Sequence, residues 1–297
     1  MDAGTESIAV LGVGRMGLPV SGRLADAGHR VIVFDVDPQR CDAAVRPGVR
    51  AAATVAEAVS ASRLILTVLP GSRELVEAMT PDGDAMTAMR PGSTWIDLTS
   101  TAPSAARTLA AAATRRGTAT LDAPMGGGPA DAATGDLTLY VGGDAAVLQR
   151  WHPVLASVAS TVHHVGPSGT GCLVKHLVNL LWFGQAALSA EAALLAAAAG
   201  IAPGHLLRLL DAGPAASRFL QRDFPRVLTG DLLPTFGLAR IVEELESVAA
   251  EAGGPGSPSR VIDAVAEAYR HALRDLGPVD GELAIVAHLE ALAGRRL

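Results

Sequence analysis

Residues 8–17 read IAVLGVGRMG, and this stretch decides the fold of the N-terminal half of the chain. The apolar run before the glycines predicts a buried strand, and the residues after them predict a helix. Gly12, Gly14 and Gly17 form a G-x-G-x-x-G pattern between the two elements. The first glycine permits a tight turn, the second lets the backbone approach a pyrophosphate, and the third allows the helix to pack closely on the strand. The stretch therefore predicts the first strand–turn–helix unit of a dinucleotide-binding fold.

The sequence that follows this unit bears on the choice of dinucleotide. A second predicted strand ends at Asp35, about twenty residues downstream, where a carboxylate accepts hydrogen bonds from the adenosine ribose. A carboxylate there repels a 2′-phosphate, so NAD is favoured over NADP. Arg40 lies nearby and leaves NADP open as an alternative. Arg15 and Met16 complete the predicted cofactor loop, because the N-terminus of a helix presents free N–H groups and partial positive charge to phosphates.

The rest of the first half alternates short β-branched runs with amphipathic or alanine-rich segments, a pattern typical of a parallel, doubly wound sheet. Helices are expected between most of the strands. The expected strands are Ile8–Leu11, Val31–Phe34, Leu64–Val68, Thr94–Asp97, Thr118–Leu121, Leu137–Val141 and Thr161–Val165, and the expected helices include Met16–Ala27, Pro103–Arg116 and Ala145–Val158.

The strand signal disappears after about Gly166, and only helical segments follow. They are Thr170–Ala199, Pro203–Asp211, Leu238–Ala252, Pro258–Leu276 and Asp280–Ala293, separated by glycine and proline clusters. The fold class is therefore an α/β Rossmann-type domain followed by an all-α domain. We expect the dinucleotide-binding domain to span residues 1–166 and the helical domain, which serves substrate binding and oligomerisation, to span residues 167–297.

Composition excludes several classes of protein. The chain has 297 residues, 49% of them apolar, and a formal net charge of −6 without a basic run, which argues against nucleic acid as a partner. Its most apolar stretch, residues 173–201, is interrupted by polar and charged side chains and predicts a buried helix instead of a membrane span. Two cysteines form no disulfide framework, and no signal peptide precedes the first strand, so we expect a cytoplasmic protein.

The chain contains 24 basic residues, and 23 of them are arginine. Lys175, the single lysine, lies at the start of the long predicted helix, and Asn179 follows one turn later on the same face. A lysine in an apolar environment has its pKa lowered toward neutrality, which suits proton exchange with an alcohol or carbonyl oxygen, whereas arginine stays protonated. These two residues are the candidate catalytic pair. The alternative is that Lys175 is an ordinary surface lysine.

Three loops complete the set of candidate site segments. Leu69-Pro70 follows the third expected strand, and Asp97-Leu98-Thr99-Ser100 follows the fourth, at the edge where ligands of open α/β sheets bind. Residues 122–129 read DAPMGGGP, and their consecutive glycines present backbone N–H groups suited to an anion such as a carboxylate. Each loop taken alone is also compatible with an ordinary turn or connector. The eight histidines show no metal-ligand spacing, so no metal is expected.

Five motifs in order make the chain resemble the β-hydroxyacid dehydrogenase family, whose members include 3-hydroxyisobutyrate dehydrogenases. They are the glycine-rich stretch up to Gly17 with the strand ending at Asp35, the loops at Leu69-Pro70 and Asp97–Ser100, the loop Asp122–Gly128, and the segment Gly171–Asn179. The resemblance covers essentially the whole chain. It implies an NAD-dependent oxidoreductase that transfers a hydride between the cofactor and a small 3-hydroxy acid or its semialdehyde.

The same resemblance implies roles for individual residues. Lys175 is the general acid/base at the reacting oxygen, and Asn179 holds the lysine and the substrate. Gly127 and Gly128 bind the substrate carboxylate through their N–H groups, and Ser100 lines the nicotinamide side. Phe236 near the site is retained from the family pattern.

Two positions depart from the family pattern. Gly126 stands where the family has a serine, so a hydroxyl contact to the substrate is missing. Glu243 and Glu244 stand where the family has lysine and aspartate, and Arg240, one turn earlier, is expected to pair with one of them. We expect a substrate with an uncharged or amine-bearing tail at these positions; the alternative is a solvated ion network on this helix.

Two other functions remain open. One is an imine or ketone reductase on the same scaffold, although such enzymes commonly replace the helix lysine. The other is a non-catalytic nucleotide-binding protein. A helical domain built around one long helix is too short to close a core by itself, so we expect a homodimer or homotetramer.

Overall fold

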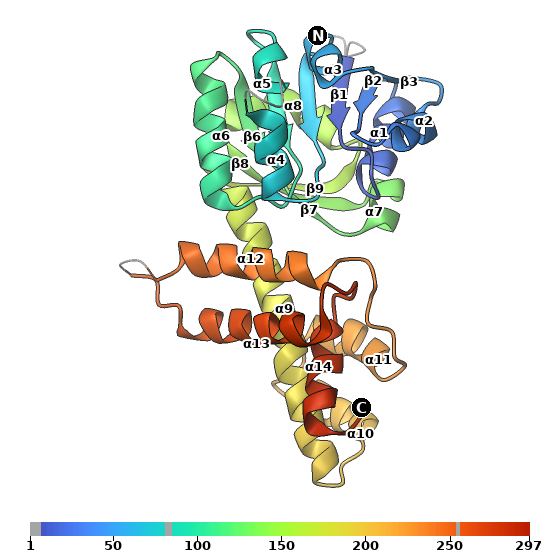
Figure 1. Cartoon of the computed structure of the whole chain (residues 1–297), viewed down its shortest axis with the longest axis vertical. Coiled ribbons are helices and arrows are strands. Elements are labelled where there is room, and N and C mark those ends of the chain that lie inside the picture. The colour runs from blue at the N-terminus through green and yellow to red at the C-terminus, as the bar shows by residue number, and fades with distance from the viewer. Residues whose placement is uncertain (1–6, 81–84, 254–255) are drawn as a thin grey trace. The chain divides into compact units, whose positions relative to one another are not determined.

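A computed structural model describes residues 7–80, 85–253 and 256–297 (Figure 1). The chain divides into two compact units, Met1–Lys175 and His176–Leu297. The first unit contains the sheet, and the second contains helices, as the predicted fold class required. Helix α9, Thr170–Ala198, begins in the first unit and ends in the second.

The first unit is built on one sheet in the order β3-β2-β1-β4-β5-β6-β8-β7, with β9 paired to β8. Parallel ladders join the strands from β3 to β6 and join β8 to β9. The strands are β1 (Ser7–Leu11), β2 (Arg30–Phe34), β3 (Val49–Ala51), β4 (Leu64–Thr67), β5 (Thr94–Asp97), β6 (Ala119–Asp122), β7 (Met125–Gly126), β8 (Leu137–Gly143) and β9 (Ala159–Gly166). The order reverses at β1, which is the switch point where nucleotides bind in folds of this type.

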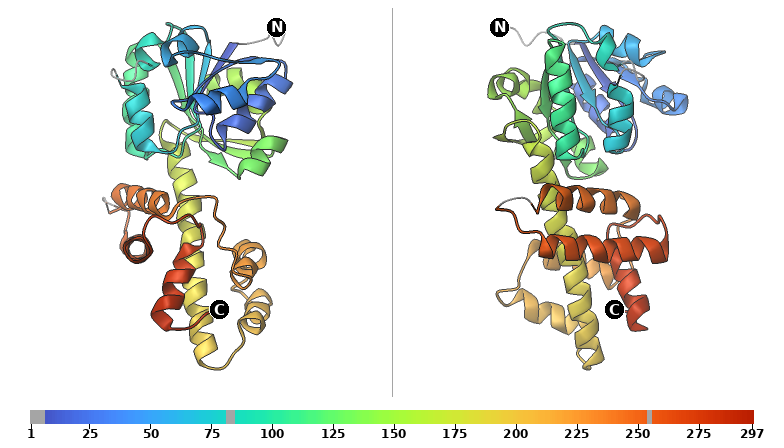
Figure 2. Two further views of the ribbon diagram at one scale, coloured as in Figure 1. Left: turned by 45° about the vertical axis from the view of Figure 1, so that its right-hand side comes forward. Right: turned by 60° about the vertical axis from the view of Figure 1, so that its left-hand side comes forward.

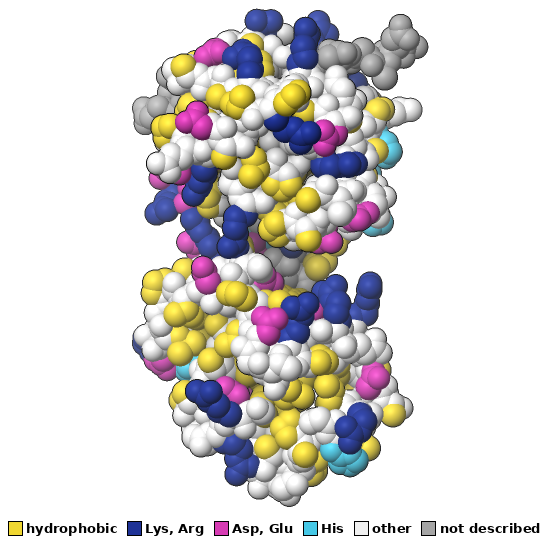
Figure 3. Space-filling model, turned by 90° about the vertical axis from the view of Figure 1, so that its right-hand side faces the viewer, with side chains coloured by type: hydrophobic (Ala, Val, Ile, Leu, Met, Phe, Trp, Pro, Cys, Tyr) yellow, Lys and Arg dark blue, Asp and Glu magenta, His cyan; other side chains and the backbone are white. Residues whose placement is uncertain are grey.

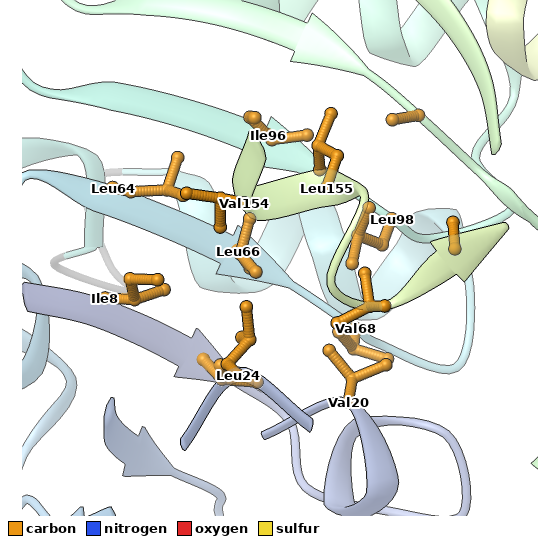
Figure 4. Close-up of a cluster of buried hydrophobic side chains, with 14 of the residues drawn as sticks. Ile8, Val20, Leu24, Leu64, Leu66, Val68, Ile96, Leu98, Val154 and Leu155 are labelled. Carbon is orange, nitrogen blue, oxygen red and sulfur yellow. The ribbon is translucent and has the colours of Figure 1, made fainter. Parts of the chain in front are cut away.

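Helices cover both faces of the sheet, which explains why the central strands β4 and β5 are buried at every position. On one face, side chains such as Ile8, Leu64 and Ile96 pack with α1 (Gly17–Asp26) and α8 (Ala145–Leu155), as Figure 4 shows. The alternate residues pack on the other face against α3 (Val55–Ser60), α4 (Ser72–Met79), α5 (Ala85–Ala88) and α6 (Pro103–Arg115). The short helices α2 (Pro38–Ala44) and α7 (Pro129–Thr134) complete the unit.

The predicted parallel, doubly wound sheet is confirmed for most of its strands, but one edge differs. Strand β8 runs antiparallel to both β6 and β7, so the sheet is mixed there. Strands β3 and β7, with three and two residues, were not predicted because segments so short carry no measurable alternation. The helix expected over residues 145–158 ends at Leu155, two residues after the internal Pro153.

The second unit is built from helices joined by turns and loops within its described residues (Figure 2). Its core lies between α9 and the other helices and includes Phe183, Tyr269 and Ile285. These helices are α10 (Pro203–Asp211), a π-helical turn (Phe219–Asp223), α11 (Phe224–Val227), α12 (Leu238–Glu251), α13 (Arg260–Leu276) and α14 (Ala284–Ala293). The last helix begins four residues later than expected, after Gly281, which has a φ of +154°.

Helix α9 is long and apolar enough by composition to cross a membrane, and 39% of its most apolar window is buried. One of its faces supplies Leu180, Phe183 and Ala190 to the core of the second unit. A core helix of a water-soluble protein has the same composition, so length and hydropathy alone do not identify a membrane span.

Candidate active site

The glycine-rich turn between β1 and α1 has the geometry that nucleotide binding needs. Gly12 has a φ of +91°, and a Cβ at Gly17 would overlap the carbonyl oxygen of Gly12, so both positions require glycine. A Cβ at Gly14 would instead lie no closer than 3.8 Å to a neighbouring side chain, the Arg40 guanidinium. Gly14 therefore leaves open space above the turn. No side chain within the described residues caps the start of α1 at Met16, and the Leu18 N–H donates to the carbonyl oxygen of Gly14 at 3.0 Å. The partial positive charge at this end of the helix suits an anion such as a phosphate.

Asp35, just beyond β2, is tied to this turn. Its Oδ2 accepts a hydrogen bond from Val13 N at 2.9 Å, and its Oδ1 accepts one from Asp37 N at 3.0 Å. The Arg40 guanidinium lies 3.7 Å from Oδ1 and is half exposed. The carboxylate thus orders the turn, a structural role that the sequence did not reveal. Arg15 is exposed at the tip of the turn, and Met16 packs partly on the core.

The loops after β4 and β5 are held together by Asp97, a buried carboxyl at the end of β5. Its oxygens accept hydrogen bonds from Thr67 Oγ1 (2.7 Å), Thr99 N (3.0 Å) and Thr101 Oγ1 (2.8 Å). Thr99 Oγ1 in turn accepts a hydrogen bond from Leu69 N at 3.1 Å. The network fixes both predicted cofactor loops, with Leu69 and Ser100 half-buried and Pro70 exposed.

Burial raises the pKa of Asp97 to about 6, and the hydrogen bonds from the three threonines oppose that shift. Its carboxyl is therefore ionised at neutral pH and able to accept from all three donors. Burial likewise raises the pKa of the Cys172 thiol well above its usual range, and the nearby charges of Asp122 and Asp97 add to this effect. The thiol stays protonated at neutral pH, so it is not a candidate nucleophile or base.

The predicted substrate loop, Gly126–Gly128, lies between β6 and α7 and is called the glycine loop below. Gly126 and Gly128 are half-exposed, and Gly127 is exposed. Gly127 has a φ of +108°, and a Cβ there would lie 2.9 Å from the Asp131 carboxylate. The Gly128 N–H donates to Asp131 Oδ2 at 2.7 Å. An anion could use the Gly128 N–H only by displacing Asp131, so the glycine loop is less suited to a carboxylate than its sequence implied.

Lys175 is half-buried on the second turn of α9, within the first unit. Asn179 lies one turn later on the same helix, and its Nδ2 donates to Glu244 Oε2 at 2.6 Å. Glu244 is buried on α12. Arg240, expected to pair with one of the two glutamates, pairs with the exposed Glu243 at 2.7 Å. Phe236 is half-buried and packs on the core of the second unit.

The first unit therefore brings together the glycine turn, Asp35, the loops after β4 and β5 and the glycine loop at the carboxyl edge of its sheet. The second unit joins Asn179 to Glu244. Among the described residues, no group of three or more His, Cys, Asp or Glu side chains is arranged to hold a metal ion.

Two family models cover most of the chain. A model described as the NAD-binding domain of 6-phosphogluconate dehydrogenase matches residues 7–166. A model described as NAD-binding of NADP-dependent 3-hydroxyisobutyrate dehydrogenase matches residues 169–289.

Individual proteins of known sequence or structure are similar to this chain over much of its length. The 2-(hydroxymethyl)glutarate dehydrogenase of Eubacterium barkeri is 30% identical over 87% of this chain and 86% of its own length. An NAD-dependent L-serine dehydrogenase of Pseudomonas aeruginosa is 37% identical over 66% of each chain. The structure of Mycobacterium tuberculosis 3-hydroxyisobutyrate dehydrogenase with L-serine superposes with a TM-score of 0.87 at 28% identity, covering 96% of this chain and 99% of that one.

Proposed function

The chain belongs to the β-hydroxyacid dehydrogenase family, and from that premise we propose that it oxidises a small 3-hydroxy acid, or reduces its semialdehyde, with NAD. The observation that carries the proposal is the ordered turn Gly12–Gly17 with Asp35 bonded to it, in the same unit as Lys175. A bound nicotinamide supplies the hydride acceptor or donor. The cofactor is an NAD(P) dinucleotide, and Asp35 favours NAD.

The roles proposed for the remaining residues follow the chemistry of the reaction. The neutral Nζ of Lys175 accepts the hydroxyl proton as the substrate carbon loses its hydride, and returns it in the reverse direction. Asn179, held by Glu244, ties α9 to α12 within the second unit. Ser100 and Leu69-Pro70 border the cofactor, and Gly126 with Gly127 borders the substrate.

For the substrate, we propose a hydroxy acid whose tail is uncharged or carries an amine. Asp131 places a carboxylate against the glycine loop, and Gly126 offers no hydroxyl. Two of the similar proteins have L-serine in their names or titles. Glu243, however, is exposed and paired with Arg240, so its charge is already partly balanced.

The test is reduction of NAD, followed by absorbance at alkaline pH, with L-serine, 3-hydroxyisobutyrate, glycerate, 4-hydroxybutyrate and 2-(hydroxymethyl)glutarate. Turnover of serine or another substrate with an uncharged tail supports the proposal. Preference for the dicarboxylate would contradict the substrate class, and cofactor binding without turnover of any alcohol would favour a non-catalytic protein.

Replacing Asp35 by asparagine is expected to change the ratio of kcat/KM for NAD to that for NADP by about 100-fold in favour of NADP. The change removes the charge that repels a 2′-phosphate and one of the two ion pairs of Arg40, each effect contributing about 1–2 kcal/mol. Steady-state kinetics with both cofactors measures the ratio. Asp144→Asn, which alters an exposed carboxylate that caps α8, is the control and should leave the ratio unchanged. Adding Arg40→Ala to Asp35→Asn should remove most of the gain in kcat/KM for NADP. An unaltered ratio in Asp35→Asn would contradict the proposed role of Asp35 in favouring NAD.

We also propose that the chain forms a homodimer or homotetramer in the cytoplasm. Leu181, Leu188 and Leu195 recur every seven residues on α9 and are 66%, 70% and 75% exposed. This spacing places them on one face as an apolar stripe, which a second copy would cover. Figure 3 shows further hydrophobic side chains on the surface of the second unit. The free, buried Cys41 and Cys172 suit a reducing compartment.

Replacing Leu188 by glutamate is expected to convert the oligomer into monomers, because the charge would have to be buried at the centre of the stripe. Light scattering after size-exclusion chromatography measures the mass over a range of concentrations. Val45→Glu, at an exposed apolar position in the first unit, is the matched control and should keep the mass of the wild type. A wild-type protein that is monomeric at every concentration would rule out this role for α9.

A further inference from the structure

We propose that Asp122 is a positioning residue that clamps the start of α9 to the sheet and thereby sets the position of Lys175. Its two carboxylate oxygens engage two different N–H groups at the start of that helix. Oδ1 accepts from Gly169 N at 2.7 Å, and Oδ2 accepts from Cys172 N at 3.0 Å, over sequence separations of 47 and 50 residues. The consequence for Lys175 rests on the proposed function; the clamp itself does not.

The two bonds have the geometry of a helix cap supplied by a distant strand. Gly169 O accepts the first bond of α9, from Leu173 N at 3.1 Å, so Gly169 occupies the position before the first helical residue. A cap normally satisfies the N–H group of the third helical residue with a side chain at the Gly169 position. Glycine has no side chain, and Asp122 takes over this task from β6. Its negative charge also lies at the positive end of the helix dipole.

Two glycines make the close approach of helix and sheet possible. A Cβ at Gly171 would overlap the carbonyl oxygen of Tyr140 and would lie 2.7 Å from that of Asp122. A Cβ at Gly142 on β8 would lie 2.7 Å from Asp122 Oδ1 and 2.8 Å from Gly171 N. The start of α9 therefore rests directly on the backbone of β6 and β8, and Asp122 is 4% exposed in the contact.

Asp122 connects two segments of the proposed active site. Lys175 follows Cys172 by three residues, about 4.5 Å along the helix axis. On the other side, β6 leads within a few residues to the glycine loop at Gly126–Gly128. The clamp thus fixes the helix that carries the proton-transferring amine relative to the loop assigned to the substrate. A shift of about 1 Å in such a group costs roughly 100-fold in rate.

The test compares Asp122→Asn with the wild type by two readouts. An amide retains one acceptor and turns its NH2 group toward a backbone N–H, so one of the two bonds is lost. We expect kcat to fall about 100-fold while KM for NAD changes less than about threefold. Hydrogen exchange measured by mass spectrometry should be at least about tenfold faster in peptides spanning residues 169–175. Asp144→Asn, which alters an exposed carboxylate that caps α8, should change neither readout.

Should Asp122→Asn fail to fold, Gly171→Ala gives the same two readouts, because it keeps the carboxylate but displaces the helix from the sheet. Unchanged hydrogen exchange in residues 169–175 of a folded variant would show that Asp122 does not hold the start of α9. Faster hydrogen exchange with an unchanged kcat would show that Asp122 does not position Lys175. A wild-type protein that turns over no hydroxy acid would refute the proposed function. Hydrogen exchange alone would then test whether Asp122 holds the start of α9.

Discussion

Replacing Lys175 by arginine is expected to lower kcat about 1,000-fold while leaving the affinity for NAD within about threefold of the wild type. Arginine keeps a long basic side chain at this position, but its guanidinium does not release a proton at working pH. General acid–base catalysis by one side chain contributes about 100- to 10,000-fold, and this contribution would be lost. Stopped-flow or steady-state kinetics measures kcat, and fluorescence titration measures NAD binding.

The composition of the chain provides an independent form of the same experiment. Because Lys175 is the single lysine, acetylation of amines modifies only this side chain and the N-terminal amine, and it converts the Lys175 amine into an amide that accepts no proton at working pH. Lys175→Arg, treated in the same way, is the control for modification of the terminus. A Lys175→Arg variant that retains activity within about threefold would refute the acid/base role, whatever the effect of acetylation.

Sequence patterns predicted strands such as β1 and β2, because four consecutive apolar residues next to a glycine-rich turn or a polar loop admit few other interpretations. Strands β3 and β7 lack such a run, and the antiparallel position of β8 depends on pairing between distant segments. The glycine turn was predictable for a further reason: its pattern lies within six residues, and the steric requirement at Gly17 is set by Gly12 in the same stretch.

Side-chain contacts between distant segments were not predictable in the same way. Asn179 and Glu244 were both identified, but their hydrogen bond spans 65 residues, and no local rule pairs them. Arg240 and Glu243 lie three residues apart on one helix, and local spacing therefore restricted their pairing to two options. Asp122 belonged to a recognised loop, yet its contact with α9 becomes visible only when β6 and the helix are placed in space.

The glycine turn allows a last prediction that separates folding from binding. Gly17→Ala is expected to raise the Kd for NAD at least about 100-fold and to lower Tm, because the added Cβ overlaps the Gly12 carbonyl oxygen and must push α1 away from β1. Overpacking of this kind costs about 1–3 kcal/mol of stability. Calorimetry and fluorescence titration measure the two quantities.

Gly14→Ala is the matched control, since the two substitutions add the same methyl group three residues apart. The Cβ at position 14 meets nothing closer than Arg40 Nη1 at 3.8 Å, so Tm should stay close to that of the wild type. Its methyl group points into the space proposed for the pyrophosphate, and NAD binding should weaken by about tenfold or more. Weakened binding without a change in Tm would locate the cofactor directly above this turn. Unchanged NAD binding in Gly14→Ala would show that the dinucleotide does not use it, and the role assigned to the glycine pattern would then be purely structural.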